Sequence, residues 1–299
     1  MSEITRVAVV GAGTMGRQIA LYAARGGYPT ALYDSDPAAL VRAGNAAADF
    51  LAALGVSAAE SEAVRGRLRY VSDLADALRG ADLAIEAVPE RMDLKRAVFA
   101  ALDEHAPEGV IIATNSSSMR VSLIEDATAR PTRVANLHFY SPIPDKPMVE
   151  IGGGTRTDAD VLDALTVFVR RIGLLPLRVK RESTGFIFNR VWRAIKRESL
   201  RVVQEGVASI EDVDRAFMTM FHTPYGPFGL MDEVGLDVVA DIERHYAAES
   251  GDPADLPPPI LTECVARGEI GVKAGRGFYT YPNPAYQSPD FLNPAGEAS

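Results

Sequence analysis

The sequence predicts an α/β protein in which a doubly wound, mostly parallel sheet is followed by an all-helical domain. Three observations support this class. Short apolar runs alternate with amphipathic, helix-length segments through the first half. A glycine-rich turn directly follows the first apolar run, and the pattern becomes purely helical near residue 183. We therefore expect one domain over residues 1–182 and a second over 183–299.

The expected elements follow from these runs in chain order. Eight apolar runs predict strands over 6–11, 29–34, 68–72, 81–88, 109–115, 133–139, 148–152 and 174–180. Segments rich in Ala, Leu, Arg and Glu predict helices between most of them, including 14–26, 91–105 and 158–172. Beyond 183 the periodicity is helical, with one short strand expected over 277–281.

Composition excludes several functional classes. The net charge of −9 argues against a general nucleic-acid binder, which needs a basic surface. A single cysteine, Cys264, cannot form an internal disulfide, which fits a reducing compartment. We find no metal-ligand cluster, no signal peptide and no apolar run of membrane-spanning length. A soluble cytoplasmic protein is expected, without a metal and without a membrane or nucleic-acid partner.

The stretch "GAGTMG" lies between the first predicted strand and the first predicted helix, which is the context that a dinucleotide-binding loop requires. Gly11 allows the tight turn, Gly13 lets a pyrophosphate approach the backbone, and Gly16 lets strand and helix pack closely. Thr14 and Met15 begin the helix, whose free N–H groups would face the phosphates. We expect these five residues to bind the cofactor in a Rossmann-type domain.

The second predicted strand ends at Asp34, 18 residues after Gly16. A carboxylate there accepts hydrogen bonds from the adenosine ribose and repels a 2′-phosphate, so the sequence favours NAD over NADP. The alternative is a glycine-rich turn with a solvent-facing aspartate.

His138 and Glu150 are titratable residues within two predicted strands that a proline-rich turn separates. An antiparallel return of the second strand would bring them together. A neutral imidazole near pH 7 can accept the proton of an alcohol during hydride transfer, and a buried carboxylate can fix its tautomer. The alternative is a structural histidine, which is the interpretation that we keep for His105 in a predicted loop and for His222 and His245.

Several motifs in one order resemble the L-3-hydroxyacyl-CoA dehydrogenases over nearly the whole chain. They are "GAGTMG", "EAVPE" (86–90), "ATNSSS" (113–118), "LHFYSPIPDKPMVEI" (137–151), "GFIFNR" (185–190), "PYGPFGLMDEVGLD" (224–237) and "GVKAGRGFYTY" (271–281).

The resemblance implies catalytic roles for four residues. His138 matches the catalytic base and Glu150 its partner, while Ser117 and Asn189 match residues that hold the reacting oxygen. It also implies a homodimer formed through the helical domain. Two of these residues have simpler alternatives, since Ser117 could cap a helix over 119–128 and Asn189 could cap a helix or bond the backbone.

The resemblance also places three residues near the nicotinamide end of the cofactor. Glu90 and Lys95 match residues near the nicotinamide ribose, although Lys95 could be a solvated surface lysine. Ser141 stands where the family usually has asparagine. A serine is shorter and has fewer donors, so we expect contacts with nicotinamide or substrate to be rearranged there.

A second departure concerns charge. Family members that bind CoA commonly carry a lysine-rich helix after the second strand, but here Arg42 is the only base in that region. Arg190, Arg193, Arg197 and Arg201 recur at helical spacing and share one face. That face could receive CoA phosphates, an acidic carrier protein or a carboxylate substrate; alternatively, it is a solvated face paired with neighbouring glutamates.

The expected activity is NAD-dependent oxidation of a 3-hydroxyacyl thioester, or the reverse reduction. Loss of the lysine-rich segment motivates an alternative substrate, a non-CoA hydroxy acid or a carrier-bound intermediate. A non-catalytic, crystallin-like NAD-binding protein is less consistent with the four catalytic-type residues. A dehydrogenase that uses a catalytic lysine would have to rely on Lys196, and it would leave His138 and Glu150 without a role.

Overall fold

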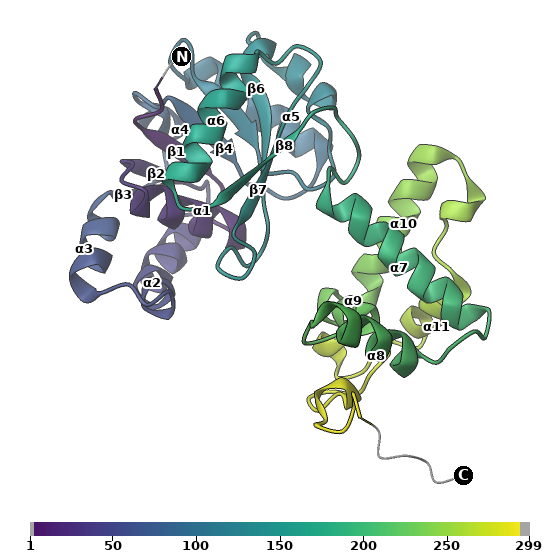
Figure 1. Ribbon diagram of the computed structural model, residues 1–299. Helices are drawn as coiled ribbons and strands as arrows, with labels where there is room; N and C mark the ends of the chain where they lie inside the picture. Colours follow the sequence, from purple (N-terminus) through teal and green to yellow (C-terminus); the bar gives the residue numbers. More distant parts are fainter. Residues whose placement is uncertain (1–2, 294–299) are drawn as a thin grey trace, which may run out of the picture. The chain divides into compact units, whose positions relative to one another are not determined.

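The computed structural model describes residues 3–293. The chain divides into two compact units, Met1–Phe188 and Asn189–Ser299, which we call the sheet unit and the helical unit (Figure 1). All named strands lie in the sheet unit, and helices dominate the described part of the helical unit. The predicted α/β class with a helical second part is confirmed. Across residues 3–293 no helix has both the length and the apolar composition that crossing a membrane requires.

All eight predicted strands are present in one sheet of order β3-β2-β1-β4-β5-β6-β7-β8. Every neighbouring pair is parallel except β6 and β7, which are antiparallel. The strands are β1 (Val7–Val10), β2 (Thr30–Tyr33), β3 (Leu68–Val71), β4 (Leu83–Glu86), β5 (Ile111–Thr114), β6 (Val134–Phe139), β7 (Met148–Gly153) and β8 (Leu175–Val179).

Helices cover both faces of the sheet, as a parallel sheet requires. One core contains side chains of α1 (Thr14–Arg25), α2 (Pro37–Ala53), α3 (Ala58–Gly66) and α6 (Ala159–Arg171). The opposite core contains side chains of α4 (Leu74–Leu78), α5 (Met92–His105) and the turns η1 (Val121–Leu123) and η2 (Glu125–Ala127). The remaining turn, η3 (Pro131–Arg133), precedes β6. His105 therefore ends a helix and does not lie in the predicted loop.

Short polar side chains start several of these helices. Asp36 accepts a hydrogen bond from the Ala38 amide at 2.9 Å, and Pro37 occupies the first turn of α2. Ser57 and Asp73 cap α3 and α4 in the same way. The N-cap residue of α1 is Gly13, which has no side chain, so the first amides of α1 have no side-chain partner at the cap.

The helical unit packs around its own core, which includes Phe228, Met231 and Leu261. Its elements are α7 (Phe188–Gln204, beginning at the last residue of the sheet unit), α8 (Ile210–Phe221), α9 (Pro227–Val234), α10 (Leu236–Ser250) and α11 (Pro259–Ala266), with the turns η4 (Pro253–Asp255), η5 (Val272–Ala274) and η6 (Ala285–Gln287).

The strand predicted over 277–281 is wrong. From that segment only Thr280 pairs, in an isolated bridge with Arg276, which forms a second bridge with Gly271. The reason is a buried carboxylate: Asp232 accepts hydrogen bonds from the amides of Phe278 and Tyr279 at 2.9 and 2.8 Å. These amides bind a side chain and are not available to a partner strand.

A second buried carboxylate, Asp214, ties α8 to the start of α9. It accepts the amides of Phe228 and Gly229 at 2.8 and 2.9 Å and the Tyr279 hydroxyl at 3.0 Å. A Cβ on Gly226 would lie 2.5 Å from the Asp214 carboxyl, so the local sequence must stay small there. Hydrogen bonds to buried aspartates thus connect the motif at 271–281 to α8 and to the motif at 224–237.

Candidate active site

The carboxyl ends of β1, β2, β4, β5 and β6 lie at one edge of the sheet, because these strands run parallel. The predicted site segments follow these strand ends. They are the glycine loop after β1, Asp34 after β2, Glu90 after β4, the serines after β5, and His138 with Ser141 at the end of β6. The strand order reverses between β1 and β4, and open α/β sheets bind their ligands at such a point.

In the glycine loop, the fold requires some of the glycines, and a bound ligand would require another. Gly11 has φ +105°, and a Cβ there would lie 2.7 Å from the Ala87 carbonyl oxygen. A Cβ on Gly16 would lie 1.7 Å from the Gly11 carbonyl oxygen, so the fold requires both glycines. Around Gly13 no described atom beyond its own chain neighbours lies within 4 Å of an added Cβ. The middle glycine thus keeps open space beside the first turn of α1, which fits a bound pyrophosphate.

The neighbouring loop residues agree with this interpretation. Thr14 is exposed at the first position of α1, while Met15 is half-buried and packs against the core. Asp34 accepts the Ala12 amide at 2.7 Å and the Asp36 amide at 2.9 Å. These bonds hold the carboxylate beside the glycine loop, where it can meet a ribose.

Lys95 is buried, with 1% of its surface exposed, so the surface alternative for this residue is wrong. Its ammonium lies 2.8 Å from Glu86, which is fully buried, and 3.1 Å from Glu90. Burial raises the pKa of Glu90, but Lys95 and hydrogen bonds from Ser116 and Ser118 outweigh it and hold that pKa below its usual value. Lys95 therefore fixes a charged Glu90 at the sheet edge.

The three serines after β5 have different surroundings. The hydroxyls of Ser116 and Ser118 donate to Glu90, and Ser116 also accepts the Met119 amide at 2.8 Å. Ser117 is exposed, and its hydroxyl has no hydrogen bond within residues 3–293. The segment 119–128 forms η1 and η2 and no α-helix. Ser117 is therefore not a helix cap, and its hydroxyl remains available to a ligand.

His138 and Glu150 face each other across the antiparallel pair β6–β7, in direct register. The Nδ1 atom of His138 lies 3.0 Å from Oε2 of Glu150, and the two residues are 4% and 0% exposed. A carboxylate accepts, so Nδ1 carries the proton and Nε2 of the neutral ring is left with a lone pair. This is the tautomer that a general base needs, and the predicted juxtaposition is present.

Glu150 has further partners that the sequence did not indicate. The Tyr140 hydroxyl donates to the same Oε2 at 2.8 Å. The other oxygen, Oε1, accepts the amides of Ile187 and Phe188 at 2.9 and 2.8 Å. The only available signal was the apolar segment "GFIFNR", which reveals no partner.

These partners keep Glu150 ionised. Burial raises its pKa, but hydrogen bonds from His138, the Phe188 amide and Tyr140 together lower the pKa below its usual value. Burial and the neighbouring Glu150 raise the pKa of Tyr140, which therefore stays protonated and donates. The arrangement can remove a proton from an alcohol while the carboxylate supports the resulting imidazolium.

Two predicted residues lie at segment ends. Asn189 is the first residue of the helical unit and the second of α7, and its side chain makes no hydrogen bond to the backbone within the described chain. Ser141 is exposed, and its carbonyl oxygen accepts the Lys146 ammonium at 2.8 Å.

The arginine face of α7 pairs with carboxylates of its own unit. The alternative of a solvated face paired with neighbouring glutamates is confirmed for Arg201, which is exposed and lies 3.7 Å from Glu198 and 3.8 Å from Glu205. Arg193 lies 2.8 Å from both Glu243 and Asp255, and Arg197 also pairs with Asp255. Burial lowers the pKa of Lys196, which is 2% exposed and pairs with Glu243 at 3.3 Å. These pairs fasten α10 and η4 to α7. Arg193 and Arg197 are thus neutralised within the unit, and Lys196 is a buried structural lysine.

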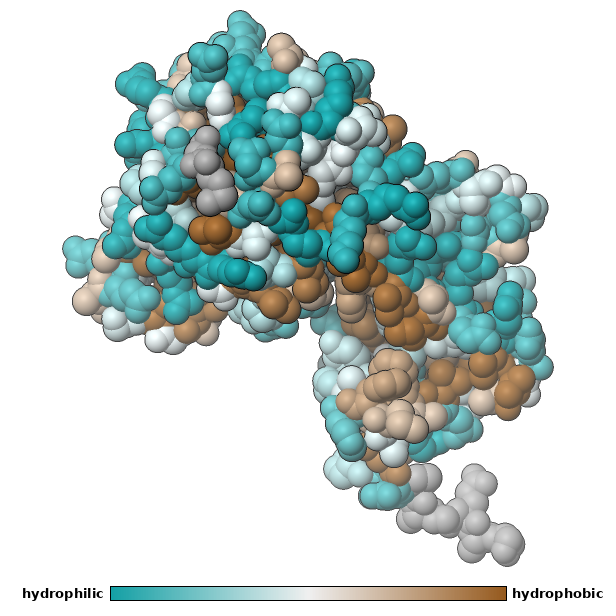
Figure 2. Space-filling view, turned by 45° about the horizontal axis from the view of Figure 1, so that its top comes forward, coloured by the Kyte–Doolittle hydropathy of each residue, from teal (hydrophilic) through white to brown (hydrophobic). Residues whose placement is uncertain are grey.

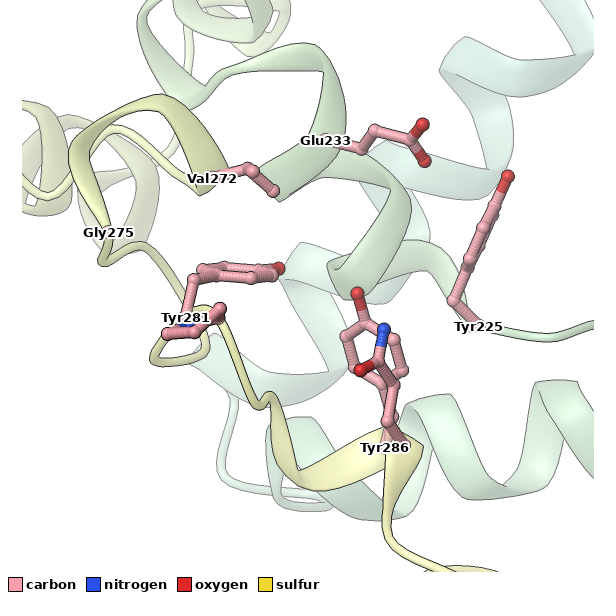
Figure 3. A pocket seen from close by; sticks show the side chains of 8 residues that line it. Tyr225, Glu233, Val272, Gly275, Tyr281 and Tyr286 are labelled. Carbon is pink, nitrogen blue, oxygen red and sulfur yellow. The ribbon is translucent and has the colours of Figure 1, made fainter.

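A pocket of about 610 Å³ lies in the helical unit, between α9 and the C-terminal segment. Figure 3 shows the side chains that line it. Tyr225, Tyr281 and Tyr286 line it together with Glu233. None of the predicted site residues contributes to this pocket.

Comparison with known proteins agrees with the geometry at the sheet edge. The family model for the NAD binding domain of 3-hydroxyacyl-CoA dehydrogenase matches residues 6–183, and the model for its C-terminal domain matches residues 185–281. A 3-hydroxybutyryl-CoA dehydrogenase of Mycobacterium tuberculosis is 35% identical, over 93% of this chain and 99% of that protein.

Two further relatives extend the comparison. A 5-formyl-3-hydroxy-2-methylpyridine 4-carboxylate 5-dehydrogenase of Mesorhizobium japonicum is 34% identical, over 93% of this chain and 91% of that protein. The crystal structure of (S)-3-hydroxybutyryl-CoA dehydrogenase from Ralstonia eutropha matches with a TM-score of 0.87 and 31% identity, covering 94% of this chain and 100% of that one. The chain therefore belongs to the 3-hydroxyacyl-CoA dehydrogenase family of NAD-dependent oxidoreductases.

Proposed function

We propose that this protein oxidises the 3-hydroxyl of a 3-hydroxyacyl thioester to the ketone, and catalyses the reverse reduction, with His138 as the base. The observation that carries the proposal is the buried bond from Nδ1 of His138 to Glu150 at 3.0 Å. It leaves Nε2 as the proton acceptor on a ring that cannot easily turn.

In the oxidation the O–H bond of the substrate breaks, and its proton goes to Nε2 of His138. Glu150 stabilises the imidazolium that forms. Ser117 and Asn189 donate to or accept from the reacting oxygen and so hold it near the ring. A positioned base of this kind contributes roughly 10²–10⁴ in rate.

Gly11, Gly13, Thr14, Met15 and Gly16 hold the pyrophosphate of NAD in this proposal. Asp34 binds the adenosine ribose. Bound NAD supplies the hydride acceptor for C3 of the substrate. The sheet unit is the cofactor-binding domain, and the helical unit contributes to substrate binding.

At the nicotinamide end, Glu90 is the candidate partner of the ribose hydroxyls, with Lys95 fixing its charge. Ser141 is the candidate contact to the nicotinamide or substrate, with a shorter reach than asparagine.

A CoA thioester is the proposed substrate because the relatives from M. tuberculosis and R. eutropha carry that activity in their names. A non-CoA acid is the second candidate, and two observations favour it. The relative from M. japonicum is named for a pyridine carboxylate, and Arg193 and Arg197 are committed to internal ion pairs. Arg42 pairs with Asp36 at 3.2 Å on the surface.

The test is the rate of NADH oxidation with acetoacetyl-CoA, with the N-acetylcysteamine thioester of the same acyl group, and with acetoacetate. Strong preference for the CoA ester supports the first candidate. Equal turnover of the two thioesters would remove CoA recognition from the proposal. A His138→Ala variant should lose at least about 10²-fold in kcat with the best substrate. Unchanged turnover in that variant would sink the catalytic assignment and favour a non-catalytic NAD-binding role.

We also propose a cytoplasmic homodimer formed through the helical unit. Its exposed apolar side chains support this proposal, among them Val207 at 71%, Met220 at 72% and Phe221 at 62% exposed. Figure 2 shows hydrophobic side chains gathered on the visible face of this unit. The mass by light scattering tests it: a Met220→Glu, Phe221→Glu double variant should be a monomer. A monomeric wild type would contradict the proposal.

A further inference from the structure

Tyr140 belongs to the same buried cluster as His138 and Glu150. Its hydroxyl donates to Oε2 of Glu150 at 2.8 Å, and His138 Nδ1 meets the same oxygen at 3.0 Å. Tyr140 is 8% exposed and Glu150 is fully buried, so bulk water does not compete for this oxygen. One carboxylate oxygen therefore serves two buried donors.

The aromatic rings add a second constraint. The His138 ring lies 4.3 Å from the Tyr140 ring and 5.8 Å from the Phe186 ring, measured between centroids and tilted by 50° and 43°. The far side of Tyr140 meets Phe188 edge-on at 5.5 Å. The imidazole is thus in contact with the residue that also shares its carboxylate.

Because Tyr140 and His138 share one oxygen of Glu150, Tyr140 affects the basicity of His138. A hydrogen bond from a neutral donor draws negative charge away from a carboxylate, and the effect is large where the surroundings are dry. Less charge remains to stabilise a protonated imidazole. We propose that the Tyr140 hydroxyl is a positioning residue that fixes Oε2 of Glu150 and weakens its support of the imidazolium, so that His138 works as a base at lower pH. The inference rests on the proposed role of His138.

The titratable groups of this cluster are few within the described chain. His138 lies near the end of β6, Tyr140 directly follows this strand, and Glu150 lies on β7. The residue in register on β8 is Leu177, which is apolar. The segment that closes over Glu150 contributes the aromatic Phe186 and the amides of Ile187 and Phe188, and no charge. His138 and Glu150 are therefore the titratable groups on which a change at Tyr140 acts.

The experiment is the pH profile of kcat/KM in both directions for wild type and Tyr140→Phe, with the best substrate from the assay above. Removing the hydroxyl should move the acid limb of the oxidation and the alkaline limb of the reduction to higher pH by about 0.5–1 unit. A residue that only fills space would lower the rates equally at all pH values and leave both limbs in place. That result, or a shift to lower pH, would overturn the proposal.

Two controls keep the outcomes separate. Tyr70→Phe changes an exposed tyrosine on β3 and should leave the profile unmoved. An NMR titration of the histidine ring protons, with His138 assigned by its absence from His138→Ala, measures the same shift without turnover. If His138→Ala retains full activity, the proposed function fails. If His138→Ala is inactive and Tyr140→Phe moves neither the limbs nor the NMR titration, only the role of Tyr140 fails.

Discussion

Glu150 in the sheet unit and Asp232 in the helical unit are both buried carboxylates, 0% and 1% exposed. Each accepts two backbone amides and a tyrosine hydroxyl. Yet the pKa of Glu150 lies below its usual value, whereas burial raises the pKa of Asp232 despite its hydrogen bonds. Asp214 behaves like Asp232.

The difference lies in the remaining partner. Glu150 has His138, which can become a cation, while the donors of Asp232 are all neutral within the described chain. Neutral hydrogen bonds organise a loop but do not offset the loss of hydration of a buried charge. The same type of side chain thus serves proton transfer in one unit and chain connection in the other. Three predictions test this contrast, and a fourth tests the glycine loop.

The largest effect is expected for Glu150→Gln, because the amide cannot support an imidazolium and presents a donor where only acceptors fit. We expect kcat to fall by about 10²–10⁴-fold. Glu62→Gln, an exposed change on α3, is the matched control and should leave kcat unchanged. Retention of more than a tenth of the activity in Glu150→Gln would contradict a role for the charge.

Asp232→Ala should act on stability and not on chemistry. It leaves the Phe278 and Tyr279 amides and the Tyr281 hydroxyl without their acceptor, at about 1–3 kcal/mol for each buried group. We expect the free energy of unfolding to drop by at least about 3 kcal/mol in denaturant titrations, while the folded fraction keeps its kcat. Asp241→Ala, an exposed position on α10, controls for the loss of a carboxylate. A loss below about 1 kcal/mol would show that water replaces the side chain.

In the glycine loop, Gly13 is expected to matter for ligand binding and not for the stability of the fold. A methyl group at Gly13 has free space in the protein and would meet only a bound pyrophosphate. Gly13→Ala should weaken NAD binding about tenfold, with little change in melting temperature. Gly66→Ala, at another glycine with open space around it, should leave the NAD affinity unchanged. Unchanged NAD affinity in Gly13→Ala, measured by calorimetry, would place the cofactor elsewhere.

The smallest expected effect is on stability as a function of pH, and it has opposite signs at the two carboxylates. The folded pKa of Asp232 lies above the ordinary value of 3.8, so its folded state gains stability as pH falls from the folded pKa toward 3.8. The folded pKa of Glu150 lies below its ordinary 4.5, so its contribution is complete above 4.5 and is lost as pH falls through the folded pKa.

Unfolding free energies of wild type, Asp232→Asn and Glu150→Gln between pH 7 and pH 4 measure these slopes. The advantage of wild type over Asp232→Asn should grow toward acid, and its advantage over Glu150→Gln should shrink below pH 4.5. Slopes of the same sign in both pairs would refute the contrast.

Local pattern was sufficient for most of the fold. Each of the eight strands begins and ends within a few residues of its apolar run, since a strand buried on both faces must be apolar throughout. The turn between His138 and Glu150 is short, which made their pairing predictable once an antiparallel return was assumed. The segment 277–281 failed because its amides bind Asp232, which is far away in sequence.

The sequence pattern could not predict which side chains form ion pairs with each other. Periodicity placed Arg193 and Arg197 on one face of α7, but it does not say that η4 packs on that face and neutralises them. Lys95 is a solvated residue by composition and a buried one in the structure, because Glu86 lies beneath it. The catalytic roles of His138, Ser117 and Asn189 stay predictions until variants are assayed.

The two oxygens of Glu150 reach chain segments that are far apart in sequence: His138 and Tyr140 on one side, Ile187 and Phe188 on the other. An aspartate would keep the charge but would be one methylene shorter, and it could satisfy only one of these segments. We therefore expect that even the conservative replacement of Glu150 by aspartate is not tolerated, although it preserves the charge. During divergence toward new substrates, the length of this one side chain must therefore stay as it is.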